Sequence, residues 1–154
     1  MSVTVREARP EDAAALSGVY RSAYAENRRL GFPATAESAT AETVREWIRE
    51  HRVSVAETVG TVVGGVRLER GEESARLNRL AVHPGRQGEG IGSQLLARAE
   101  AVAREWGCGA VRLTTPPEHP SLLDFYRERG YEEVGPYPLE YRDYDEVVME
   151  KRLG

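Results

Sequence analysis

Apolar and polar residues alternate along several short stretches of the chain, and elsewhere apolar residues recur at helical spacing. Alternation predicts half-buried strands, whereas a spacing of three to four predicts helices with one buried face. We expect strands at residues 3–8, 53–57, 62–69, 76–82, 111–114, 131–134 and 146–150. We expect helices from 9–12 up to a break at 30–34, and at 40–51, 91–106 and 120–129.

The predicted order is strand, two helices, three strands, helix, strand, helix and two strands. This order favours a mixed α/β (α+β) sandwich over a repeating βαβ sheet. The 154 residues contain no linker, repeat or low-complexity segment. We therefore expect a single domain spanning residues 1–154.

Composition narrows the class of protein. The chain is 40% hydrophobic and 30% charged, with a net charge of −4, which is ordinary for a globular protein and poorly suited to nucleic acid. No apolar run approaches ~20 residues, and the opening MSVTVREARP lacks the apolar core of a signal peptide. We expect a cytoplasmic protein that binds neither membrane nor nucleic acid. Its lone cysteine, Cys108, is expected to be a buried structural thiol, and no metal-ligand spacing links the three histidines.

The most informative segment is residues 76–96, RLNRLAVHPGRQGEGIGSQLL. A strand ends at Val82, His83-Pro84 breaks it, and Gly88, Gly90 and Gly92 lead into an amphipathic helix. Glycines permit positive φ and close approach to a ligand. A helix start offers unpaired N–H groups and the positive end of the dipole. The segment therefore predicts an anion site that suits a diphosphate.

Two common phosphate motifs fit this segment poorly. A nucleotide P-loop requires a lysine after its last glycine, but here Ser93 follows Gly92. A dinucleotide fingerprint requires a third glycine where Ser93 stands, and it normally lies in a βαβ unit.

The segment resembles the GNAT family of N-acetyltransferases. Gln87-x-x-Gly90-x-Gly92 matches their Q/R-x-x-G-x-G/A motif, preceded by the usual lead-in at 80–84, and the run FYRERGY at 125–131 matches a second family element at the usual spacing. The resemblance implies the GNAT fold, with a central, mostly antiparallel sheet of six to seven strands flanked by about four helices. It also implies acetyl-coenzyme A as cosubstrate.

The same resemblance implies roles for two groups of residues. The strand end would offer backbone hydrogen bonds to the pantetheine arm, and the glycine loop would offer N–H groups to the pyrophosphate. The cofactor-binding residues implied in this way are Leu80, Ala81, Val82, Gln87, Gly88, Glu89, Gly90, Ile91, Gly92 and Ser93. Glu89 and Ile91 would contribute backbone only, so we expect their side chains to be replaceable.

Tyr126 matches the family's tyrosine that faces the cofactor sulfur. A phenol could protonate the departing thiolate as a general acid. Its spacing from Leu122 and Phe125 also suits a core aromatic. We favour the catalytic role.

The pattern departs from the family where a general base is often found. Many relatives carry a glutamate at the position of Arg76, and a guanidinium cannot accept a proton. Asn78 cannot serve either. Candidate substitutes are Glu69, Glu72, Glu73 and His119, none of them supported by a pattern. His119 could also cap the following helix, touch the cofactor or lie on the surface.

The acceptor side is the least defined. In the family this side is formed by the segment between the first two helices and by the C-terminal strands, which here provide Tyr24, Asn27 and Phe32 as candidate substrate residues, and Tyr137, Tyr141 and Tyr144. Acidic residues at 141–146 would attract a cationic amine.

Three hypotheses follow for the activity. The leading one is acetyl transfer to a primary amine, with a small molecule or amino acid favoured as the partner. The second is a non-catalytic module that binds or senses acyl-coenzyme A. The third is acylation of a protein lysine or N-terminus. The sequence leaves a homodimer open.

Overall fold

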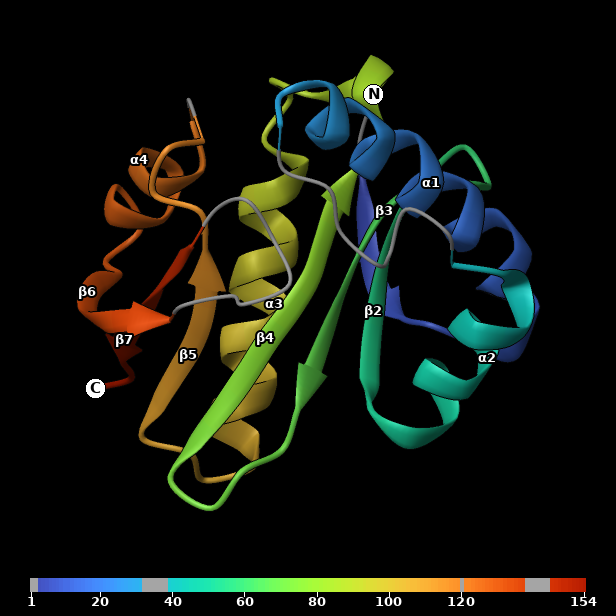
Figure 1. Ribbon diagram of the computed structural model, residues 1–154. Helices are drawn as coiled ribbons and strands as arrows, with labels where there is room; N and C mark the ends of the chain where they lie inside the picture. The colour runs from blue at the N-terminus through green and yellow to red at the C-terminus, as the bar shows by residue number, and fades with distance from the viewer. Residues whose placement is uncertain (1–2, 32–38, 120, 138–144) are drawn as a thin grey trace.

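Seven strands among the described residues form one sheet, in the order β1-β2-β3-β4-β5-β7-β6 (Figure 1). The computed structural model describes residues 3–31, 39–119, 121–137 and 145–154. Neighbouring strands are antiparallel except β4 and β5, which are parallel. The strands are β1 (Thr4–Glu7), β2 (Arg52–Thr58), β3 (Thr61–Glu69), β4 (Ser74–Val82), β5 (Ala110–Thr115), β6 (Glu132–Tyr137) and β7 (Glu146–Arg152).

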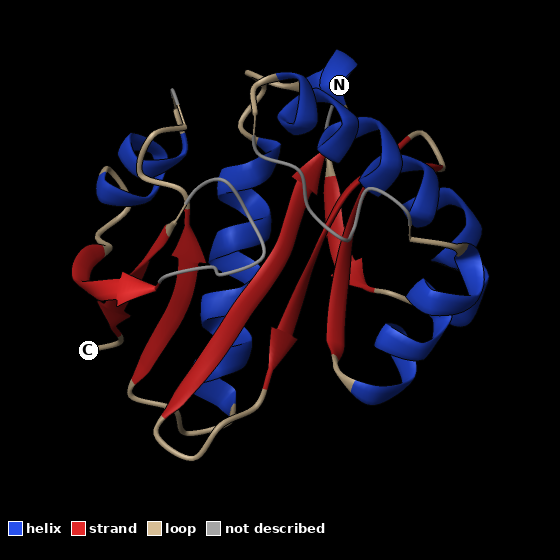
Figure 2. Cartoon of the chain, in the orientation of Figure 1, coloured by secondary structure: helices blue, strands red, loops and turns tan. Residues whose placement is uncertain are grey.

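Helices cover both faces of this sheet (Figure 2). They are α1 (Ala13–Arg29), α2 (Ala41–Glu50), α3 (Ile91–Glu105) and α4 (Leu122–Arg127), with short 3-10 turns η1 (Pro10–Asp12) and η3 (Pro84–Arg86). The start of α2 is capped by Thr40, whose Oγ1 accepts a hydrogen bond from the Thr43 N–H at 3.1 Å. None of the described helices is long and apolar enough to cross a membrane.

Two hydrophobic cores lie on opposite faces of the sheet. The first joins α1 and α2 to the sheet through buried residues such as Leu16, Tyr20 and Val44. The second joins α3 and α4 to the other face, through residues such as Leu95 and Tyr126. The C-terminal half of α1, the loop before α3 and the start of α4 consequently lie at the same end of β4 (Figure 1).

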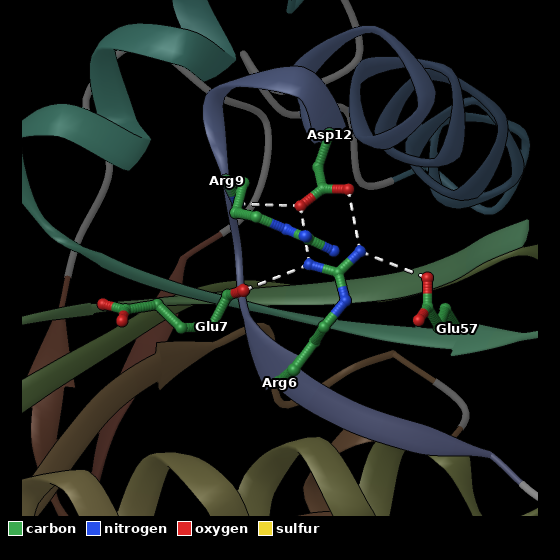
Figure 3. Close-up of polar contacts among 5 residues, drawn as sticks. All are labelled: Arg6, Glu7, Arg9, Asp12 and Glu57. Carbon is green, nitrogen blue, oxygen red and sulfur yellow. Dashed lines mark hydrogen bonds and ion pairs between the residues drawn. The ribbon is translucent and has the colours of Figure 1, made fainter. Parts of the chain in front are cut away.

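A charged network fixes the start of α1 against the edge of the sheet (Figure 3). Arg6 on β1 donates two hydrogen bonds to the Asp12 carboxylate, at 2.8 and 2.9 Å, and one to Glu57 on β2 at 3.1 Å. The Asp12 carboxylate also accepts a hydrogen bond from the Arg9 N–H at 2.7 Å. Because Asp12 immediately precedes α1, this network sets where that helix leaves β1.

The predicted order of elements and the mostly antiparallel sheet with four helices are confirmed. The last predicted strand pair differs in detail. Tyr131 lies before β6 rather than in it, and its buried ring packs edge-on against Tyr126, with centroids 5.7 Å apart. The helix expected at 120–129 is regular only over 122–127, and Gly130 ends the segment at a φ of 97°.

Candidate active site

The parallel strands β4 and β5 separate after a short stretch of pairing. Their ladder joins Ser74–Arg76 to residues 110–112, and the strands then spread apart toward the glycine loop (Figure 1). The register between β3 and β4 shifts just beyond this pairing. Gly65 pairs with Ala81 and Arg67 pairs with Asn78, so β4 contains one residue more than β3 over this stretch. The extra residue is accommodated around Arg79, which has a φ of 57°. In the described chain, the β5-facing edge of Leu80–Val82 therefore has no strand partner.

Beyond Val82 the chain forms the predicted glycine loop. His83 Nδ1 accepts a hydrogen bond from the Gly85 N–H at 3.0 Å, and η3 follows. Gly88 and Gly90 have φ of 83° and 81°, as expected for a loop that turns its N–H groups inward. Helix α3 has neither an acidic residue in its first turn nor a side-chain cap. Its first N–H groups and dipole are consequently available to a diphosphate.

Gly92 is required for a different reason. A Cβ at this position would lie 3.3 Å from Cζ of Phe125, so the glycine lets α4 pack closely against the start of α3. The expectation that the neighbouring Ile91 side chain is replaceable was wrong. Its side chain is 1% exposed and belongs to the core between α3 and the sheet, so it is not freely replaceable.

A cavity of about 500 Å³ opens where these elements meet. It is lined by the C-terminal half of α1, the end of β4, the glycine loop, His119 and part of residues 121–129. Nine of the ten sequence-predicted cofactor residues line it: Leu80, Ala81, Val82, Gln87, Gly88, Gly90, Ile91, Gly92 and Ser93. Glu89 does not. Its carboxylate accepts hydrogen bonds of 2.9–3.1 Å from Arg86 at the surface.

Tyr126 lines this cavity from α4 and is 6% exposed. Its ring stacks edge-on against Phe125, at 5.1 Å between centroids, and against Tyr131, so it is also a core aromatic. The hydroxyl forms no hydrogen bond within the described residues. Burial, with a smaller contribution from Tyr24, raises the pKa of Tyr126 above its ordinary value. The hydroxyl therefore stays protonated and is available to a ligand.

The candidate substrate residues on α1 also line the cavity. Tyr24 donates a hydrogen bond to the Leu80 carbonyl at 3.3 Å, and burial raises the pKa of its hydroxyl to about 12. Asn27 lies across the cavity from α4 and contacts His119, with 3.3 Å between Asn27 Oδ1 and His119 Nε2. Phe32 lies outside the described residues, as do Tyr141 and Tyr144.

His119 is buried, so the surface interpretation was wrong. Its Nδ1 accepts hydrogen bonds from the N–H groups of Ser121 and Leu122, at 3.2 and 3.3 Å. It thus caps the start of α4, as one alternative predicted. With Nδ1 accepting, Nε2 carries the proton and donates to Asn27. Burial lowers the pKa of His119, which keeps the ring neutral near pH 7.

The other proposed substitutes for the missing base lie outside the cavity. Arg76 is exposed on β4. Glu69 accepts hydrogen bonds from Arg67 at 2.9 Å and Asn78 at 2.7 Å. Burial alone would raise the pKa of Glu69, but these partners outweigh it and the net pKa is lowered. Residues 72–73 lie at the β3–β4 turn, at the opposite end of β4 from the glycine loop (Figure 1).

Glu26 is a cavity residue that the sequence did not indicate. It lies on α1, and its Oε2 is buried without a hydrogen-bond partner in the described structure. A buried carboxylate oxygen without a partner is costly, so this atom is suited to accept a hydrogen bond or a proton from a ligand. No motif marks it, because Glu26 is one of several charged residues on an amphipathic helix.

The chain is similar to known acetyltransferases in sequence and in fold. The model of the acetyltransferase (GNAT) family matches residues 20–131. The IAA acetyltransferase of Azospirillum brasilense is 33% identical over 104 residues, which are 66% of this chain and 68% of that protein.

Two solved structures share the fold over nearly the whole chain. The PaiA N-acetyltransferase of Thermoplasma acidophilum, in complex with coenzyme A, has a TM-score of 0.83 at 22% identity, covering 99% of this chain and all (100%) of that one. The ribosomal-protein-alanine N-acetyltransferase of Brucella melitensis has a TM-score of 0.81 at 26% identity, covering 97% and 99% of the two chains.

Proposed function

We propose that this chain, which belongs to the GNAT family of acetyltransferases, moves an acetyl group to the primary amine of a small molecule. The protein is an acyltransferase with acetyl-coenzyme A as its cosubstrate. The observation that carries the proposal is the cavity itself. In it the open edge of β4, the uncapped start of α3 and the Tyr126 hydroxyl face one common space.

Different parts of the cavity would bind different parts of acetyl-coenzyme A. The N–H groups at 88–93 would bind the diphosphate, and the backbone of Leu80–Val82 would hold the pantetheine arm and the thioester carbonyl. Acetyl-coenzyme A supplies an activated acyl group whose C–S bond breaks as the amine nitrogen bonds to the carbonyl carbon. Backbone donors on β4 would stabilise the oxyanion that forms.

Tyr126 would act as the general acid for the leaving thiolate. Its hydroxyl would donate a proton to the departing sulfur and then regain a proton from solvent. In the described residues no carboxylate stands on β4 at the usual base position, so we propose that solvent accepts the amine proton. Glu26 is the alternative acceptor within the cavity.

A non-catalytic acyl-coenzyme A module is the second candidate, and Arg76 in place of a base favours it. Release of free thiol from acetyl-coenzyme A, measured across a panel of amines and amino acids, distinguishes the two. We expect acceptor-dependent release with at least one small amine and formation of the N-acetyl product. Tight binding of acetyl-coenzyme A with no release for any amine or peptide would favour the module.

A further inference from the structure

Two arginines on neighbouring strands share one tryptophan beside the cavity. Arg67 on β3 and Arg79 on β4 place their guanidinium carbons 4.9 and 5.6 Å from the centre of the Trp47 ring on α2. Both distances lie within the range of cation–π attraction. The side chain of Arg67 is only 13% exposed, so at least one of these charges is mostly withdrawn from water.

The charges in this cluster do not balance. Arg67 is satisfied, because it donates to Glu69 at 2.9 Å and to Asn78 at 2.8 Å. Arg79 forms neither an ion pair nor a hydrogen bond with any residue that the structure describes, and its Nε is buried without a partner. Two guanidiniums thus face one carboxylate, and a buried donor lacks an acceptor. Burying such a donor costs free energy unless a ligand supplies the missing acceptor.

The backbone that presents Arg79 is itself unusual. Its φ of 57° lies in the left-handed region, which an arginine adopts only at a cost and a glycine would adopt freely. The register shift at this residue lies just beyond the end of the β4–β5 ladder, which pairs Ser74–Arg76 with residues 110–112. The next residue, Leu80, lines the cavity, and its carbonyl accepts the hydrogen bond from the Tyr24 hydroxyl.

A continuous aromatic wall joins the arginines to the cavity. Trp47 meets the Tyr20 ring edge-on, with centroids 5.6 Å apart, and Tyr20 lies 6.1 Å from Tyr24, which lines the cavity. We call these five residues the acceptor wall: Tyr20, Tyr24, Trp47, Arg67 and Arg79. Burial raises the pKa of the Tyr24 hydroxyl most, the charges of Arg79 and Arg67 act to lower it, and that of Glu146 acts to raise it. The charges of both arginines therefore reach this cavity residue.

We propose that the acceptor wall binds a carboxylate, so that the acceptor is an amino acid or another small amine bearing a carboxylate. A guanidinium presents paired N–H donors that match a carboxylate in both charge and spacing. Arg79 would supply these donors, and Arg67, held by Glu69 and Asn78, would add its charge. This inference rests on the proposed function, because it names the substrate class of the same site.

The test compares amino acids with their carboxamides and with the corresponding decarboxylated amines, by kcat/KM for acetyl transfer. We expect the carboxylate forms to be preferred roughly 10- to 100-fold, as for a charge-assisted hydrogen-bonded pair. Arg79→Gln should abolish the preference, lowering kcat/KM for the acid and leaving the amide nearly unchanged. Arg79→Lys should retain part of it. Arg76→Gln, on the same strand with the same loss of charge, should leave the preference intact.

A binding measurement separates failure of this inference from failure of the proposed function. Thermal stabilisation of the coenzyme A-bound protein by an amino acid and by its amide reports the preference even if no amine is acetylated. Greater stabilisation by the acid, lost in Arg79→Gln, supports the inference. Equal stabilisation or equal kcat/KM for acid and amide overturns it. The proposed function would stand in that case if amines are still acetylated.

Discussion

The cofactor wall of the cavity and the neighbouring acceptor wall are made of different groups. Of the acceptor wall, Tyr24 lines the cavity itself. The cofactor wall, residues 80–82, 87–88 and 90–93, offers mainly backbone N–H and carbonyl groups, placed by an opened strand edge, two left-handed glycines and a helix start. The acceptor wall offers side chains from four separate elements, α1, α2, β3 and β4, brought together by tertiary packing. A wall built from backbone groups requires particular residues at a fixed spacing in the sequence. A wall built from side chains can bind a different ligand after a few substitutions. We therefore expect the family motif to lie in the cofactor wall and the choice of acceptor to depend on the acceptor wall.

The largest effect is expected at Tyr126, the side chain proposed to protonate the leaving thiolate. Tyr126→Phe keeps the ring and removes the hydroxyl, so kcat should fall roughly ten- to a thousandfold. Affinity for acetyl-coenzyme A and the melting temperature should change little. Steady-state kinetics with any acceptor give the result.

Tyr131→Phe is the matched control for this change. It also removes a buried tyrosine hydroxyl, one that donates to Glu100 at 2.9 Å. We expect it to reduce stability and leave kcat nearly unchanged. Equal kcat in wild type and Tyr126→Phe would reduce Tyr126 to its core-aromatic role.

The second prediction concerns the pH dependence of kcat/KM for the acceptor, which reports whether the acceptor side provides a general base. An amine with a pKa near 10 is only about a thousandth neutral at pH 7, and each pH unit multiplies that fraction tenfold. Without a tuned base, kcat/KM for the acceptor should rise about tenfold per pH unit from 7 to 9. The pKa of His119 is lowered and that of Tyr126 is raised, so neither should add an inflection in this range.

A plateau starting near pH 7 would contradict that account. Glu26→Gln would then be the first variant to make, because Glu26 is the cavity carboxylate with a buried oxygen that lacks a partner. If Glu26→Gln converts the plateau into a rising profile, Glu26 is the base. If it does not, the base lies elsewhere.

The smallest effect tests the junction that holds α1, and hence Tyr24, against the sheet. Hydrogen bonding to Arg6 lowers the pKa of Asp12. The carboxylate therefore stabilises the fold above the ordinary aspartate pKa of about 4, and this contribution is lost as the pH falls through the lower folded-state pKa. Asp12→Asn should cost about 1–3 kcal/mol at pH 7, because the pair is mostly but not fully buried.

Thermal unfolding checks this prediction. At about 2–4 °C per kcal/mol the melting temperature should fall by roughly 2–12 °C at pH 7, and the difference from wild type should shrink below pH 4. Glu133→Gln, which breaks an exposed pair with Arg127, is the control and should change little. A constant difference between pH 7 and pH 3 would show that the Asp12 charge is not the source.

Most of the fold and the conformation of the glycine loop could be predicted because local rules fix them. Gly88 and Gly90 occupy left-handed conformations that glycine alone adopts cheaply, and such positions leave a trace in sequence. The acceptor wall leaves no comparable trace. The meeting of Trp47 with Arg79 depends on a bulge and on packing between segments 32 positions apart. His119 was ambiguous for the same reason, since its burial depends on α1.

The most direct test of the central claim is a calorimetric titration of acetyl-coenzyme A into wild type, Gly90→Val and Gly107→Val. Both glycines have φ near 80° and open space where a Cβ would lie, but only Gly90 lines the cavity. The backbone strain of substitution is thus matched, and only one variant alters the diphosphate loop. We predict that Gly107→Val binds like wild type and that Gly90→Val binds at least tenfold more weakly. Equal affinity in all three proteins would contradict the assignment of this loop to the cosubstrate.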